Sequence, residues 1–185
     1  KEAQHAQEAI AAPDNTDQAG EREWVDIDTD PDLLEIFLDE AQDILETILM
    51  DYQQWKSDPS SHKVIGGLQR SLHTMKGGAR MANIAPIGNL SHELETLYEG
   101  LYEGRFHANA EMFAMVEQCH DTLGDMIDDV IHEGRCRSAA HQVSLITAYA
   151  HRLWANEQTD DEHTEGLDDL QRILGSDDGE ESHDG

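Results

Sequence analysis

Residues 71–82 read Ser71-Leu72-His73-Thr74-Met75-Lys76-Gly77-Gly78-Ala79-Arg80-Met81-Ala82. They lie in a window from Pro59 to His92 that contains no Asp or Glu, although the whole chain has 40 acidic residues, 12 basic residues and a net charge of −28. The window holds four of the basic residues, Lys63, Arg70, Lys76 and Arg80. A basic patch of this kind within an anionic protein indicates a specialised surface.

The apolar residues of this window recur at the three- and four-residue steps of one buried helix face: Val64, Ile65, Leu68, Leu72, Met75, Ala79 and Ala82. His73 is off that face. The positions that share its side of the helix are Gln69, Arg70, Lys76, Gly77 and Arg80. The pattern predicts an exposed histidine flanked by cations, with Gly77 keeping the next turn open at a helix cost of about 1 kcal/mol.

The rest of the central region is also predicted to be helical. Amphipathic periodicity, caps and proline breaks delimit five helices at about residues 31–56, 61–83, 87–103, 109–134 and 138–154. No strand signal is present, and the loops after Ser61 are short, which favours antiparallel neighbours. We therefore expect an all-α fold: an antiparallel up-down four-helix bundle of the last four helices, with the additional N-terminal helix packed across one end.

The two ends of the chain differ in composition from the centre. Residues 1–29 have eight acids and two basic residues, and residues 158–185 have eleven acids and one basic residue. Such segments are expected to be disordered acidic linkers or tails on either side of a bundle at residues 30–157. The tail contains one short amphipathic segment between Gly166 and Gly175, for which a partner-binding helix and a transient or packed-down tail are both open interpretations.

Composition also excludes several kinds of protein. Nucleic acid is not expected as a partner, because the molecule has only one small positive patch. No apolar run approaches the roughly 20 residues needed to cross a bilayer, so we expect no membrane insertion and a cytoplasmic location. The 11 histidines show no HxxxH or HExxH spacing, and Cys119 and Cys136 have no metal-ligand spacing. A metal site is not predicted, and the cysteines are expected to be free thiols.

The turn near Ala85 pairs His73 with a carboxylate. His73 lies twelve positions before Ala85 and Glu95 lies ten after it, so the two are expected to face each other in an antiparallel pair. A carboxylate that accepts the Nδ1–H of His73 would leave the Nε2 lone pair free for nucleophilic attack. We find no Gly-rich phosphate loop and no hydroxyl or thiol nucleophile paired to a base. The chemistry that fits is reversible phosphorylation of His73, with Lys76 neutralising the phosphoryl oxygens.

The segment Leu72-His73-Thr74-Met75-Lys76-Gly77-Gly78-Ala79 resembles the phosphorylation motif of histidine phosphotransfer (HPt) domains, particularly that of the chemotaxis kinase CheA. His92-Glu93-Leu94-Glu95 is similar to the third-helix motif of the same family, and the resemblance covers about residues 31–154. It implies His73 as the phosphorylated residue, Lys76 as phosphate contact, Gly77 as access residue, Glu95 as hydrogen-bond partner and His92 near the site.

Arg80-Met81-Ala82-Asn83 departs from the commonest CheA pattern, where a glycine-containing run is found. This variant looks more like the chemotaxis-type hybrid kinases of type IV pilus and twitching motility systems. The resemblance implies response-regulator receiver domains and a histidine kinase catalytic domain as partners in two-component signalling. Arg70 and Arg80 suit docking of an acidic receiver face.

Two functions are compatible with these residues. The first is a phosphocarrier with no bound cofactor, in which partner domains supply ATP and Mg²⁺. The second is a catalytically silent adaptor that uses the same bundle only to bind a receiver. Since the chain shows no nucleotide site, whether it counts as an enzyme depends on the kinase domains that it works with.

Overall fold

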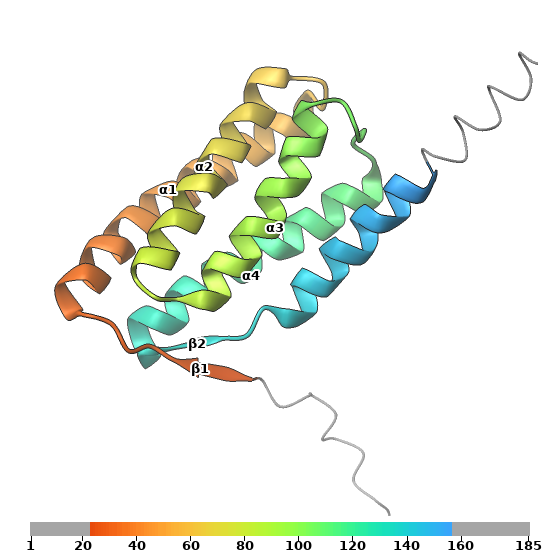
Figure 1. Cartoon of the computed structure of the whole chain (residues 1–185). Coiled ribbons are helices and arrows are strands. Elements are labelled where there is room, and N and C mark those ends of the chain that lie inside the picture. The colour runs from red at the N-terminus through yellow and green to blue at the C-terminus, as the bar shows by residue number, and fades with distance from the viewer. Residues whose placement is uncertain (1–22, 157–185) are drawn as a thin grey trace, which may run out of the picture.

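The computed structural model describes residues 23–156. Most of the linker expected at residues 1–29 and all of the tail expected at residues 158–185, with its 166–175 segment, lie outside this range. Four long helices and two short strands are arranged in the order β1 (Trp24–Asp26), α1 (Pro31–Ser57), α2 (His62–Met81), α3 (Ala85–Tyr102), α4 (Ala110–Glu133) and β2 (Arg135–Arg137). Residues 140–156 are also helical. They form the blue helix that precedes the C-terminal grey trace (Figure 1).

The helix ends follow local chemistry. Asp30 caps α1 by accepting hydrogen bonds from backbone amides of its first turn, and Pro31 occupies the first helical position. The Asn109 side chain accepts a bond from the Met112 amide at the start of α4. Gly134 ends α4 with φ of +65°, a left-handed conformation that favours glycine. These predicted helix boundaries are confirmed.

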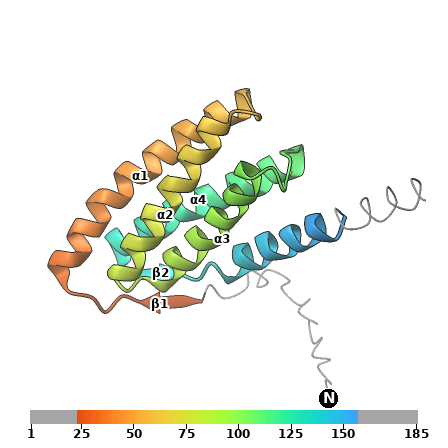
Figure 2. The same ribbon diagram turned by 45° about the horizontal axis from the view of Figure 1, so that its top comes forward.

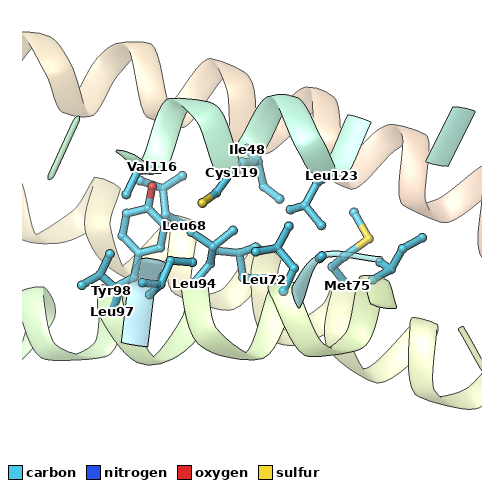
Figure 3. Packing of buried hydrophobic residues seen from close by; sticks show 14 of the residues in the cluster. Ile48, Leu68, Leu72, Met75, Leu94, Leu97, Tyr98, Val116, Cys119 and Leu123 are labelled. Atoms are coloured by element: carbon cyan, nitrogen blue, oxygen red, sulfur yellow. The ribbon is translucent and has the colours of Figure 1, made fainter. Parts of the chain in front are cut away.

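The first four helices surround a continuous apolar core. α2 packs most extensively on α3, and α1 packs on both α2 and α4. In Figure 3, residues from all four helices meet in the centre of this core, and those labelled are Ile48, Leu68, Leu72, Met75, Leu94, Leu97, Tyr98, Val116, Cys119 and Leu123. All seven apolar residues predicted for the buried face of α2 are buried. The all-α bundle predicted from the sequence is thus confirmed.

The helices are placed differently from the expectation in one respect. α1 lies lengthwise beside α2 in both views rather than across one end of the bundle (Figures 1 and 2). The bundle consists of α1–α4, and helix 140–156 is the additional helix, lying along α3 and α4 and contributing Ile146 and Tyr149 to the core. Periodicity shows which face of a helix is buried, but it does not show which neighbour covers that face.

The two strands were not predicted. β1 pairs antiparallel with β2, with Val25 opposite Cys136, and the Arg135 guanidinium lies 4.1 Å from the centre of the Trp24 ring. Residues 24–26, which were expected to belong to the disordered linker at residues 1–29, therefore form part of the folded structure. A three-residue strand is too short to show the two-residue alternation by which strands are recognised. Cys136 lies in β2, and both it and Cys119 are buried free thiols.

Within residues 23–156, none of the helices combines the length and the apolarity needed to cross a bilayer.

Candidate functional site

The site is built on the exposed side of α2. His73 follows the buried Leu72 directly, and its side chain is 69% exposed. α2 and α3 are antiparallel and are joined by a tight turn at Asn83, whose φ is +56°. The exposed side of α3 therefore lies next to the side of α2 that carries His73. The histidine predicted to be exposed is therefore accessible to a second molecule while its helix is held in the core.

Glu95 of α3 links two residues of α2. Its Oε1 lies 2.7 Å from Nδ1 of His73, and its Oε2 forms an ion pair with Nζ of Lys76. The Glu95 and Lys76 side chains are only 13% and 15% exposed. The contact predicted between His73 and Glu95 is thus present. Lys76 faces the carboxylate, so its predicted role as phosphate contact stays a prediction.

Lys76 and His73 together keep the Glu95 carboxyl ionised. Burial by itself raises the pKa of the Glu95 carboxyl, but hydrogen bonds and charge from Lys76 and His73 outweigh it, and the net pKa lies below its usual value. An ionised Glu95 accepts a hydrogen bond from the protonated Nδ1 of His73, which places the lone pair of the ring on Nε2. Since the ring is mostly exposed, that lone pair is available to an incoming electrophile.

The two glycines after Lys76 have different surroundings. A Cβ built on Gly77 would meet no atom within 4 Å, whereas a Cβ on Gly78 would lie 3.0 Å from Cδ2 of Phe37 in α1. Gly78 thus allows α1 and α2 to approach closely, while Gly77 borders open space one turn beyond His73. This geometry agrees with the access role predicted for Gly77.

The two arginines proposed for docking differ in their contacts. The Arg70 guanidinium extends over Gly66 and Gly67, and its charge acts on Asp51 of α1. Burial, which raises the pKa of Asp51, outweighs the lowering by Arg70. The stem of Arg80 instead passes beside Gly88 of α3. Among residues 23–156, Arg80 has no carboxylate partner within ion-pair distance.

His92 is exposed on α3, three positions before Glu95. The structure shows no side-chain contact between it and His73, Lys76 or Glu95 within the described residues. It lines a hollow of about 440 Å³ together with residues 138–140, 143 and 144 and Val25. The structure therefore does not bring His92 into the His73 cluster, and its predicted part in the site stays a prediction.

A second histidine, which the sequence did not distinguish, is buried in the core. Nε2 of His120 lies 3.2 Å from the Tyr98 hydroxyl, and burial lowers the pKa of His120 to about 3. Burial also raises the pKa of Tyr98 well above its usual range, so the hydroxyl stays protonated and forms a hydrogen bond with Nε2. His120 lies four residues after Val116 and three before Leu123, and this spacing could have indicated that it belongs to the buried face of α4.

This arrangement supports covalent chemistry at one nitrogen. The carboxylate fixes the ring, compensates for positive charge that forms on it, and leaves Nε2 facing outward. Among the described residues, no group of three or more His, Cys, Asp or Glu side chains is placed to hold a metal ion.

Known proteins share both the fold and the sequence pattern. The CheA phosphotransferase domain from Thermotoga maritima has a similar structure, with a TM-score of 0.52 and 21% identity, over 54% of this chain and 95% of that one. The chemotaxis protein CheA of Listeria monocytogenes is 24% identical over 70% of this chain and 20% of that protein. A gliding motility regulatory protein of Myxococcus xanthus is 32% identical over 53% of this chain and 12% of that protein. The chain thus spans about a fifth or less of the length of these two relatives.

The Hpt domain family model matches residues 32–133, which is more than half of the chain and includes α2, α3 and the whole His73–Glu95–Lys76 cluster. Strand β1 and helix 140–156 lie outside the matched range. The chain belongs to the Hpt domain family.

Proposed function

We propose that His73 carries a phosphoryl group, which it exchanges with a histidine kinase catalytic domain or with the aspartate of a response-regulator receiver domain. The observation that carries this proposal is the 2.7 Å contact between Nδ1 of His73 and Oε1 of Glu95 on a ring that is 69% exposed. The contact orients the ring and the exposure lets a donor reach it. Membership of the Hpt domain family supports the same chemistry.

In the proposed step, the Nε2 lone pair attacks the phosphorus of the donor, and an N–P bond forms as the P–O bond to the leaving group breaks. The leaving group is ADP when a kinase domain is the donor and an aspartate carboxylate when a receiver is the donor. Glu95 holds the Nδ1 proton throughout and stabilises the charge on the ring. Partner domains supply ATP and Mg²⁺, which organise the phosphoryl group for transfer.

Receiver docking is proposed on the same side of α2. Arg80 carries a charge that no carboxylate of the described residues neutralises, and it lies two helical turns after His73. Arg70 lies one turn before His73, but its charge already acts on Asp51. We therefore expect both arginines to steer an acidic receiver and Arg80 to contribute more.

The cellular system is also part of the proposal. The names of the relatives described above refer to chemotaxis and to gliding motility. Together with the Arg80-Met81-Ala82-Asn83 variant, these names favour a chemotaxis-type kinase of a surface-motility system, such as type IV pilus or twitching motility, acting in the cytoplasm. The alternative, a silent adaptor that binds a receiver without being phosphorylated, would use the same exposed surface.

A labelling experiment separates the two. The chain, His73→Gln and His92→Gln are each incubated with a phosphorylated receiver or an active kinase catalytic domain and labelled phosphate. We expect acid-labile, alkali-stable label on the chain and on His92→Gln, but none on His73→Gln. Equal labelling of the His73→Gln variant would place the phosphoryl group elsewhere. Intact receiver binding with no label from any donor would instead establish the adaptor.

A further inference from the structure

An apolar groove lies apart from the His73 cluster, on the other flank of α3. Its walls are α3, the loop after α3 and helix 140–156, and its volume is about 310 Å³. The apolar lining is provided mainly by Leu97, Phe106, Ile146, Ala150 and Trp154. The Trp154 side chain is 50% exposed, which leaves a large aromatic surface uncovered at one end of the groove.

The described chain ends next to this groove. Trp154 lines it, and the described residues end at Asn156, two positions later. The following ten residues, 157–166, precede an apolar pattern at Leu167, Leu170, Ile173 and Leu174. Ten residues span up to about 35 Å when extended, which is more than enough for the chain to reverse and return along the helix that it has just left.

The pattern of this segment matches the groove. Its four apolar residues recur at steps of three and four, so in a helix they share one face, while Asp168 and Asp169 lie off that face. The lining of the groove includes one carboxylate, Glu93, and one guanidinium, Arg105, which also contacts Glu103. An isolated helix of about ten residues is marginal in water, so such a segment needs an apolar surface to fold against.

We infer that residues 167–174 of the same chain bind in the groove between α3 and helix 140–156, as an amphipathic helix that covers Trp154. This intramolecular contact is additional to the proposed phosphotransfer and does not involve His73.

The test uses the full chain with a spin label on Ser176→Cys, just beyond the segment. Cys119 and Cys136 are buried, and burial raises the pKa of each thiol to about 12, so the label reacts selectively. We expect paramagnetic loss of the amide signals of Thr96, Thr147 and Ala150, with the signals of Met50 and Gly77 retained. Intact signals at all three groove positions would overturn the inference.

Two matched variants make the test specific. Leu170→Asp with Leu174→Asp, which leaves the described bundle unchanged, should restore the groove signals. Ala150→Glu in the groove should restore them too, while Ala148→Glu, which is exposed and does not line the groove, should not. Signal loss that survives the tail variant would contradict the assigned face.

A second copy of the chain is the other possible occupant. Isotope-labelled chain without a spin label is mixed with spin-labelled chain at natural isotope abundance, so that only contacts between molecules cause signal loss. Loss in this mixture would overturn the intramolecular contact. Phosphate labelling of His73 should be the same for the chain and the tail variant, so this test can fail without affecting the proposed function.

Discussion

Glu95 lies 2.7 Å from His73 although 22 positions separate the two residues in the chain. They come from the two helices that pack most extensively on each other, α2 and α3. The same carboxylate holds Lys76 through its other oxygen. One side chain of α3 thus organises the exposed ring and a neighbouring cation of α2.

Glu95→Gln removes the negative charge while keeping the size of the side chain. Because the carboxylate fixes the ring and compensates for its positive charge, we expect phosphorylation of His73 to slow by roughly ten- to a hundredfold, by analogy with the loss of a carboxylate that orients a metal-bound histidine. Rapid-quench phosphotransfer measures the rate. The control is Glu99→Gln, one turn further along α3, and a similar loss in both variants would argue against a specific role for Glu95.

Lys76→Met tests the ion pair directly. Burial raises the pKa of Glu95, and the lysine is the first of the partners that lower it, so the variant should move the pKa of Glu95 upward. A carboxyl whose pKa is lowered in the folded state stabilises the fold at pH values above its ordinary pKa of 4.5. This contribution to stability is lost as the pH falls through the pKa of the folded state. NMR titration of the Glu95 carboxyl carbon measures the pKa. An unchanged pKa in the variant would show that Lys76 does not hold the carboxylate.

Gly77→Ala and Gly78→Ala make the same chemical change at two consecutive positions of α2. At Gly77 the methyl group meets open space, so we expect the free energy of unfolding to rise by about 0.5–1 kcal/mol from helix propensity, while phosphorylation of His73 slows because access is narrowed.

At Gly78 the new Cβ would lie 3.0 Å from Phe37, which is buried, so we expect a net loss of roughly 1 kcal/mol or more. Urea denaturation measures both variants. Equal stabilisation by the two substitutions would contradict the close approach of α1 at Gly78.

His120 predicts a loss of stability in acid. Burial lowers its pKa from 6.5 to about 3 in the folded chain, so the unfolded chain binds a proton first as the pH falls. The free energy of unfolding should therefore decrease between about pH 6.5 and pH 3, by up to roughly 5 kcal/mol from this residue. Gln can still accept a bond from Tyr98 but does not titrate, so His120→Gln should flatten the pH dependence measured by urea denaturation. An unchanged slope would assign the acid sensitivity to other groups.

Much of the site could be predicted because it depends on spacing within one helix. The buried face of α2, the exposure of His73 and the open position of Gly77 all follow from a period of 3.6 residues. Predicting the pairing of His73 with Glu95 also required a tight turn between two antiparallel helices. Pro86, at the start of α3, indicated where that turn lies. Residues equally distant from such a turn lie at the same height, so the partner could be identified by counting.

The orientation of long side chains was not predictable in this way. The Lys76 ammonium could extend into solvent or toward α3, and the spacing within α2 does not distinguish the two. It extends toward α3 because the Glu95 carboxylate lies there. The family resemblance implied a place for His92 near the site, yet the hollow that it lines is formed with residues 138–140, 143 and 144. Similarly, the β1–β2 pairing joins segments more than a hundred residues apart through three residues each.

The sequence by itself determined the helices, their ends, the buried face of each and the histidine left exposed, because these depend on local propensity, capping and periodicity along one segment. Only the tertiary structure decided that α1 completes the bundle while helix 140–156 lies along its side, that the charge of Arg70 acts on Asp51 while the stem of Arg80 passes beside Gly88, and that His120 is buried against Tyr98. These features depend on which apolar faces meet and which polar groups are desolvated together. Such choices are made by packing between distant segments, and no single segment encodes them.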